Sequence, residues 1–406
     1  MIKFLLKGLL RDKSRSRLPV LVVTIGVTLT VLMHAYITGF MGDIIEINAR
    51  FSYGHLKVMT RGYADNMRQS PNDLALLNVS SLIDDLKEQY PGTEWSPRIQ
   101  FAGLVDIPDE NGETRSQGPA AAMGLELLAQ GSAEIKRMNF VKSLVRGQMP
   151  SKQNEVLLSD EFSRKLGVNP GDRITFISST MNGSMSITNF VLAGTVSMGH
   201  EALDKGTLIA DIQDARNALD MEDSAGEILG FLKGGFYIDE VARSEAEKFN
   251  SASSVNTDGF TPVMKTLSEQ GTMGTYVNMT KLWSFYISLV FIIAMSLVLW
   301  NARLLGGLRR YGEFGIRLAM GEEKGHIYST LIYESIMIGL AGSLIGTFFG
   351  LLFAWLIQKY GIDISGLMRG SSMMLPTVIR ARISPVDFYL AARWYLPFHG
   401  GAVWSY

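Results

Sequence analysis

Residues Leu18–Met41 read LPVLVVTIGVTLTVLMHAYITGFM and include no Asp, Glu, Lys or Arg. A helix needs about 20 apolar residues to cross a hydrocarbon core of about 30 Å, so this run predicts a membrane-spanning helix. Two more uncharged apolar runs follow, Leu282–Ala302 and Ser335–Ile357. The sequence therefore predicts an α-helical membrane protein in which three spans are evident.

A long polar block, Gly42 to Lys281, separates the first and second runs. It is long enough for one or two folded domains. Arg173–Ser178 and Phe190–Val196 have the composition of strands, and Asp211–Met221 has helical spacing of its apolar residues. The block is therefore expected to be a large mixed α+β domain inserted between the first and second spans.

Local signals add detail inside this block. Glu155–Gly167 predicts a strand that runs into a helix ended by its glycine. Asn182-Gly183 predicts the tip of a hairpin. Ser251–Asp258 has the composition of a loop, and Thr261-Pro262 predicts the start of a helix that leads toward the second span.

Basic residues set the expected orientation. The flank before the first run and the loop after the second run carry Lys3, Lys7, Arg11, Lys13, Arg15 and Arg17, and Arg303, Arg309, Arg310, Arg317 and Lys324. Short basic flanks stay in the cytoplasm, so the N-terminus is predicted to be cytoplasmic and the polar block extracytoplasmic. A cleaved signal peptide is the alternative for the first run, but the run is too long and no small-x-small site follows.

Composition and motifs exclude several functions. A net charge of -1 argues against nucleic acid as the main partner. The chain has no cysteine, so cysteine usage does not identify the compartment. HExxH, CxxC, GxxxxGK[ST] and nucleophile-elbow patterns are all missing from the sequence, which predicts no metal site, no catalytic residue and no ATP site in this chain.

The loop after the second run contains the first candidate site. Its members share one short helical segment between Arg309 and Gly321, and they are Glu313, Phe314, Gly315, Ile316, Arg317 and Gly321. Glu313 and Arg317 have the i,i+4 spacing that allows an ion pair. A helix that is apolar on one side and charged on the other suits a partner's groove. From the residues alone, a solvated loop whose charges only set the topology is favoured over a docking helix.

The third run contains a second candidate site, the series Gly342, Gly346 and Gly350. Glycines at this spacing let helix backbones approach closely in lipid, either within the subunit or across a dimer, although glycine is also generally tolerated there. His34 lies inside the first run, where a helix-packing hydrogen bond is favoured over a proton site. Glu334, near the cytoplasmic end of the third run, is expected to snorkel or to pair.

Three stretches carry a resemblance to a known family. They are RRYGEFGIRLAMGEEKGHI (Arg309–Ile327), GQMPSKQNEVLLSDEFSRKLGVNPGDRITF (Gly147–Phe176) and YGHLKVMTRGY (Tyr53–Tyr63). With the order of spans and insert, the chain resembles the permease family that includes FtsX, the LolC and LolE lipoprotein-release subunits and the macrolide exporter MacB. Phe314 and Met320 depart mildly from the family pattern and keep its apolar character.

The resemblance implies a non-catalytic permease subunit of an ATP-binding-cassette complex in the bacterial inner membrane, with a MacB-like periplasmic domain. It implies that Glu313–Gly321 dock on a separate ATPase subunit, which binds the ATP and Mg, and that a second permease subunit completes a homo- or heterodimer. Membrane lipid and a lipoprotein cargo are the other implied partners. Activation of a cell-wall hydrolase in the manner of FtsX, and export of a small amphiphile, stay open as alternatives.

The expected organisation follows. Residues 1–17 form a cytoplasmic amphipathic helix, 18–41 the first span, 42–281 the periplasmic domain, 282–302 the second span, 303–327 the coupling loop, 328–357 the third span and 358–406 an extracytoplasmic tail. The family's last span is expected soon after Ser384-Pro385, but Arg393 and Pro397 interrupt that tail, so a fourth span is predicted to be absent. This departure keeps a third reading open, a membrane-anchored binding domain without energy coupling.

Overall fold

The chain divides into two compact units in a computed structural model. Residues 1–43, 276–367 and 376–406 belong to the helical unit, and residues 44–275 with 368–375 belong to the sheet unit. The structure describes residues 13–109, 112–199, 201–252, 258–280, scattered positions between 282 and 297, 311–363, 378–385 and 387–388. The predicted amphipathic helix, most of the second run and most of the tail lie outside the described residues.

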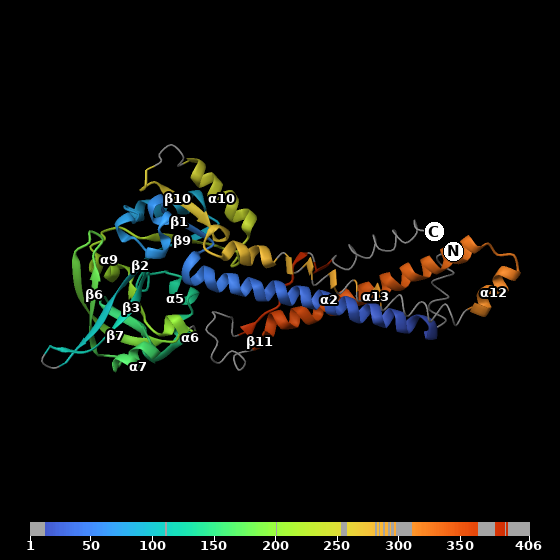
Figure 1. Cartoon of the computed structure of the whole chain (residues 1–406), viewed down its shortest axis with the longest axis horizontal. Helices are drawn as coiled ribbons and strands as arrows, with labels where there is room; N and C mark the ends of the chain where they lie inside the picture. The colour runs from blue at the N-terminus through green and yellow to red at the C-terminus, as the bar shows by residue number, and fades with distance from the viewer. Residues whose placement is uncertain are drawn as a thin grey trace. The chain divides into compact units, whose positions relative to one another are not determined.

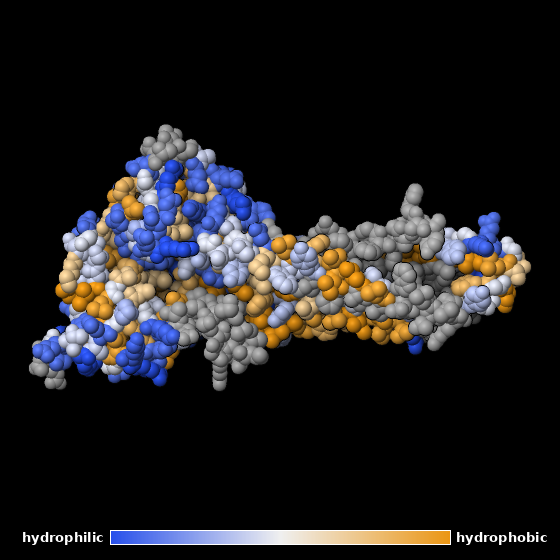
Figure 2. All heavy atoms as spheres, viewed as in Figure 1, coloured by the Kyte–Doolittle hydropathy of each residue, from blue (hydrophilic) through white to orange (hydrophobic). Residues whose placement is uncertain are grey.

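The helical unit is built on two long helices, α2 (Lys13–Asn48) and α13 (Lys324–Tyr360), and a short one, α12 (Tyr311–Ala319) (Figure 1). Among the described residues, two stretches are long and apolar enough to cross a membrane, Arg17–Tyr53 and Ile336–Tyr360, and each contains an 18-residue window with a mean hydropathy of 2.1. Figure 2 shows hydrophobic side chains along both helices. These helices contain the first and third runs of the sequence. A short pair of strands, β11 (Ile362–Asp363) and β12 (Val378–Ile379), also belongs to this unit.

The sheet unit begins at Ile44, so it includes the last residues of α2. A π-helical turn, η1 (Ala49–Tyr53), leads from α2 into the first strand. The strands are β1 (Leu56–Thr60), β2 (Thr93–Pro108), β3 (Thr114–Leu125), β4 (Leu144–Gly147), β5 (Glu155–Ser159), β6 (Arg173–Ser179), β7 (Met185–Val196), β8 (Thr207–Asp211), β9 (Glu227–Leu232) and β10 (Pro262–Thr266). Their order is β10-β1-β9-β2-β3-β8-β5-β7-β4, and β6 pairs with β2 and β7.

Short helices connect these strands. They are α3 (Arg61–Asp65), α4 (Val79–Gln89), α5 (Glu134–Arg137), α6 (Phe140–Ser143), α7 (Asp160–Leu166), α8 (Glu201–Asp204), α9 (Ile212–Leu219) and α10 (Asp239–Ala252), with the 3-10 turns η2 (Met67–Gln69), η3 (Asn72–Leu74) and η4 (Leu267–Glu269). Mixed pairing, antiparallel for β2 with β3 and parallel for β3 with β8, makes this a large α+β domain, as the sequence predicts.

The strand β2 organises the core of the sheet unit. Its first half pairs with β9, and its second half pairs with β6 on the same side. Ile99, Phe101 and Val105 alternate on its buried face. The Phe101 ring meets the Phe176 ring edge-on, with centroids 5.5 Å apart. Burying an apolar side chain of this size contributes about 1.5–3 kcal/mol. The buried face of β2 therefore stabilises the region in which its pairing changes from β9 to β6.

Several predicted elements of the domain are confirmed. Glu155–Ser159 form β5, which runs into α7, and acidic residues in the first turn of α7 and basic residues in its last turn suit the helix dipole. Gly167 ends α7 with a φ of +70°, a conformation that glycine adopts without strain. Gly183, with a φ of +81°, lies in the turn between β6 and β7, where a hairpin tip was expected.

The predicted helix at Thr261-Pro262 is wrong. Pro262 instead begins the strand β10, which pairs with β1 in the register Thr60↔Pro262. Proline is tolerated as the first residue of an edge strand because that position need not donate to the ladder. The helical signal lies four residues later, where Thr266 and Glu269 form a capping box around η4.

Candidate coupling helix and helix-packing surfaces

The short helix α12 presents apolar side chains to solvent. Glu313, Phe314, Gly315, Ile316 and Arg317, the predicted coupling residues, all lie on it. None of its residues is buried, and the exposed apolar side chains on it and in the turn after it are Tyr311 (80%), Ile316 (63%), Leu318 (42%) and Met320 (75%). Large exposed apolar side chains gathered on one short element indicate a candidate contact surface. Figure 2 shows hydrophobic and hydrophilic side chains together over α12.

A fixed turn joins α12 to α13. The Gly321 N–H donates to the Leu318 carbonyl at 3.1 Å, and the Glu322 N–H donates to the Arg317 carbonyl at 3.1 Å. These two bonds define a Schellman motif, which needs a left-handed residue after the helix. Gly321 supplies it with a φ of +90°. The direction in which α12 leaves α13 is therefore set by backbone geometry.

Charges around this turn are close but solvated. The Arg317 Nε lies 3.8 Å from Glu322 Oε2, and the His326 Nε2 lies 3.8 Å from Glu322 Oε1. Pairs with this exposure contribute about 0–1 kcal/mol, so they shape the surface of α12 and its turn more than they stabilise it.

The three glycines of α13 lie against α2. An ideal Cβ built on Gly342, Gly346 or Gly350 would come within 2.6, 2.7 or 2.8 Å of the Cβ of Val23, Val27 or Val31, respectively. Real Cβ atoms do not approach each other so closely, so only glycine allows this helix contact. The sequence predicted close packing, and the structure places the partner within the same chain.

Hydroxyl groups reinforce this contact. Thr28 Oγ1 donates to the Gly346 carbonyl at 3.1 Å, and Thr24 Oγ1 is 3.4 Å from the Gly342 carbonyl. Interhelical hydrogen bonds of this kind contribute about 0.6–2 kcal/mol in lipid. Packing and hydrogen bonds together make α2 and α13 one body in the helical unit.

His34 makes the helix-packing hydrogen bond that the sequence favoured. Its Nδ1 lies 2.7 Å from Asp387 Oδ1, and both side chains are buried. The Ser384 N–H and hydroxyl donate to the other Asp387 oxygen at 2.6 and 3.0 Å. The Arg382 N–H donates to the Ala35 carbonyl at 2.9 Å. The described residues 378–385 and 387–388 are therefore fastened to α2 as well.

The turn η1, which follows α2 and belongs to the sheet unit, is held by buried side chains of that unit. Three successive carbonyls of η1, those of Phe51, Ser52 and Tyr53, accept hydrogen bonds from Arg98 Nη1 (3.1 Å), Lys57 Nζ (2.7 Å) and Gln270 Nε2 (3.2 Å). The last carbonyls of a helix carry its negative dipole and lack helical partners. We call Lys57, Arg98 and Gln270 the carbonyl clamp. It joins η1 to β1, β2 and the residue after η4.

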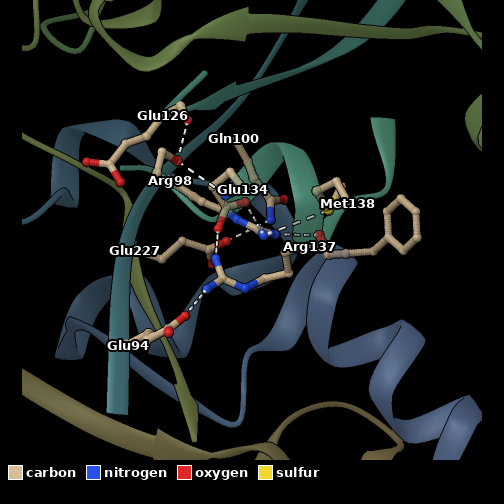
Figure 3. Close-up of polar contacts among 10 residues, drawn as sticks. Glu94, Arg98, Gln100, Glu126, Glu134, Arg137, Met138 and Glu227 are labelled. Carbon is tan, nitrogen blue, oxygen red and sulfur yellow. Dashed lines mark hydrogen bonds and ion pairs between the residues drawn. The ribbon is translucent and has the colours of Figure 1, made fainter. Parts of the chain in front are cut away.

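Each cation of the carbonyl clamp is itself paired. Lys57 Nζ lies 2.6 Å from Glu227 Oε2. Arg98 Nη2 lies 2.8 Å from Glu134 Oε2 (Figure 3). All four side chains are at most 4% exposed. Arg137 also pairs with Glu134, and its guanidinium stacks 3.9 Å from the Phe231 ring centre. Removing one partner of such a buried pair costs about 3–5 kcal/mol, so this arrangement resists displacement.

Burial and neighbouring charges shift the pKa values of two carboxyl groups of the sheet unit, Glu126 and Asp160. Burial raises the pKa of the Glu126 carboxyl, and the charge of Glu134 raises this pKa further. Burial alone would raise the pKa of Asp160, but hydrogen bonds from Arg146 and Thr195 and the charges of Arg146 and Arg164 lower it below its usual value.

Sequence reasoning missed the carbonyl clamp. Its members come from three separate segments, and only Lys57 lies in a stretch that the sequence singled out. The available signal was a lone cation inside an otherwise apolar strand pattern, as in HLKVM and SPRIQF.

Among the described residues, no group of three or more His, Cys, Asp or Glu could hold a metal ion. The methionines Met123, Met138, Met149, Met181 and Met198 are buried in or packed against the cores, whereas Met185 is 72% exposed.

Residues 285–392 match the family described as FtsX-like permease C-terminal. The lipoprotein-releasing system transmembrane protein LolC of Haemophilus influenzae is 22% identical over 235 residues, which are 56% of this chain and 56% of that protein. The match thus spans about half the length of that relative. The periplasmic region of MacB from Actinobacillus actinomycetemcomitans matches 53% of this chain and 89% of its own, at 14% identity and a TM-score of 0.36.

The C-terminal part of the chain is thus similar to the FtsX-like permeases. The resemblance to the FtsX and LolC family, predicted from the sequence, is confirmed by this match and by the similarity to LolC.

Proposed function

We propose that this chain is the membrane subunit of an ABC complex and transmits ATP-driven motion across the inner membrane to a periplasmic domain. The observation that carries the proposal is the exposed apolar surface of α12, held by a glycine turn at the start of α13. Such a helix fits a groove on an ATPase subunit. ATP and Mg would be bound by that separate subunit, and this chain would be non-catalytic.

The path of the motion follows the contacts. Displacement of α12 would move α13, because the Schellman turn fixes their junction. The glycine contact would move α2 with α13, since neither helix can slide without opening a tightly packed seam. The carbonyl clamp would then pass the movement of α2 to the strands β1 and β2. Each step uses a contact between hydrogen-bonded or tightly packed groups.

The proposed topology has three spans, residues 18–41, 282–302 and 328–357. The N-terminus and residues 303–327 lie in the cytoplasm, and residues 42–281 lie in the periplasm. The distribution of basic residues supports this orientation. A second permease subunit, identical or related, would complete the membrane part of the complex.

Release of lipoproteins is the transport activity that we favour, because the similar protein LolC is named as part of a lipoprotein-releasing system. Activation of a periplasmic cell-wall hydrolase is the runner-up. Photo-crosslinking from the periplasmic domain in cells separates them, since acylated protein would be captured in the first case and a hydrolase in the second.

The coupling role is tested by reversing both charges of α12, with Glu313→Arg and Arg317→Glu in one variant. A P-loop ATPase should co-purify with the wild-type chain and be lost from this variant. Asp84→Lys with Lys87→Asp is the matched control, because these residues form an exposed i,i+3 pair on α4 in the sheet unit. Equal recovery of the ATPase with both variants would contradict the proposal.

A further inference from the structure

Three apolar side chains are exposed close together where β9 leads into α10. Phe236, Ile238 and Val241 are 42%, 45% and 41% exposed. They lie within six consecutive residues, after the pair Gly234-Gly235, in which Gly235 has a φ of +73°. We call Phe236–Val241 the apolar loop. Other exposed apolar side chains of the described sheet unit, such as Ile187 on β7, lie on different elements.

The apolar loop is attached to the last turns of α2. The Tyr237 N–H donates to Glu46 Oε1 at 2.8 Å, and Glu46 also contacts His55 Nε2 at 3.1 Å. The Leu232 N–H, just before the loop, donates to His55 Nδ1 at 3.0 Å. Glu46 and His55 are both buried. The backbone of the loop is therefore fixed at the level of Glu46 on α2.

The level of Glu46 can be estimated along the helix. It lies five residues after Met41, the end of the first uncharged run, within the continuous helix α2. At 1.5 Å per residue this is about 7–8 Å beyond the apolar boundary. The polar layer on each side of a bilayer is roughly 5–8 Å thick, from the difference between its total and hydrocarbon thicknesses. Glu46 and the loop bonded to it thus fall at headgroup depth.

The size of the patch argues against a protein partner. An aromatic side chain has an area of about 150–250 Å². Less than half of each of the three side chains is exposed, so their exposed apolar area is a few hundred Å² at most, even if each is counted as aromatic. A specific protein interface buries about 1,200–2,000 Å² in total. Aromatic and aliphatic side chains at headgroup depth instead match the composition of membrane-interface anchors.

We propose that Phe236, Ile238 and Val241 insert into the outer headgroup layer of the same membrane that α2 crosses. The ligand is the lipid surface itself. This inference rests on the proposed function insofar as α2 must span a bilayer. The apolar loop would then hold the junction of α2 and the sheet unit at the membrane surface.

The test uses the full chain in lipid nanodiscs with single nitroxide spin labels, which the absence of native cysteine permits. Labels are placed through Ile238→Cys in the apolar loop, Ile187→Cys on β7 and Leu29→Cys on α2. Ile187 is the matched control, an isoleucine 61% exposed, and Leu29, 43% exposed, is the reference for the lipid core. Power saturation compares the accessibility of each label to oxygen, which concentrates in lipid, and to a water-soluble nickel chelate.

The label at position 238 should show an oxygen-to-nickel accessibility ratio several-fold above that at position 187 and below that at position 29. A ratio equal to that at 187, with 29 in lipid, would overturn the inference and leave the proposed span intact. Protection of position 238 from both reagents would overturn it in favour of a protein cover. A water-exposed label at position 29 would overturn the span and, with it, this inference.

Discussion

Replacing Gly346 with leucine is expected to separate α13 from α2. A Cβ at this position would lie 2.7 Å from both the Val27 Cβ and the Thr24 carbonyl oxygen. Carbon atoms pack best at about 3.5–4.0 Å, so even alanine must push the helices about 1 Å apart. Leucine adds three more carbon atoms to the same space. The hydrogen bond from Thr28 Oγ1 to the Gly346 carbonyl would open at the same time.

Two opposing effects determine whether Gly346→Leu weakens or strengthens the contact between α13 and α2. Overpacking costs about 1–3 kcal/mol, and for leucine at a backbone contact the upper end applies. Removing a glycine from a helix gains only about 0.5–1 kcal/mol. The net loss of about 2 kcal/mol lowers the ratio of packed to separated helices by more than tenfold.

Disulfide trapping measures this ratio. Ala35 and Ala354 lie in one buried cluster of the α2–α13 contact, so a cysteine at each should cross-link readily in the otherwise cysteine-free chain. Gly346→Leu should reduce the yield severalfold or more. Ala341→Leu is the matched control, because Ala341 is exposed on α13 and gains the same side chain. Wild-type yield in Gly346→Leu, or equal losses in both variants, would refute the packing argument.

Two further predictions concern the sheet unit. Arg98→Met should lower the free energy of local opening of β1 and β2 by about 1.5–3 kcal/mol, because Glu134 loses one charged donor but keeps Arg137. Arg243→Met, at a surface pair, should change it by less than about 1 kcal/mol. Hydrogen exchange of the full chain measures both values, and similar values would contradict the buried pairing. Asp160 has a lowered pKa in the folded state, so its contribution to stability is present above the unfolded value of 3.8 and is lost as the pH falls through the lower folded value. Asp160→Asn should therefore reduce the melting temperature at pH 7 but hardly at all near pH 2. If the melting temperatures of the variant and the wild type differ equally at both pH values, the ionised Asp160 carboxylate does not supply this stability.

The long helices and the local strand-to-helix signals could be predicted from the sequence because each depends on neighbouring residues. The bilayer imposes a length on an apolar run, and Gly167 or Gly183 marks a turn through its own backbone preference. The misreading of Pro262 has the opposite cause. Its strand conformation depends on pairing with β1, about two hundred residues earlier, and no local pattern records that contact.

The partners in the candidate sites could not be predicted for the same reason. The glycine series indicates close packing but does not say whether the partner is α2 or another subunit. The hydrogen bond from Gln270 to the Tyr53 carbonyl joins residues 217 positions apart. Lys57 and Arg98 can be recognised as unusual within apolar strands, but their acceptors are backbone carbonyls, which carry no sequence signature.

A photo-crosslinking amino acid at Ile316 tests the central claim most directly. In native membranes the account predicts an adduct between position 316, which is 63% exposed on α12, and a P-loop ATPase, with no such adduct from the equally exposed position 187. The adduct yield should change when ATP is trapped on the complex. An ATPase that stays bound without ever linking to position 316, or labelling of that position by a reagent confined to the periplasm, would contradict the account.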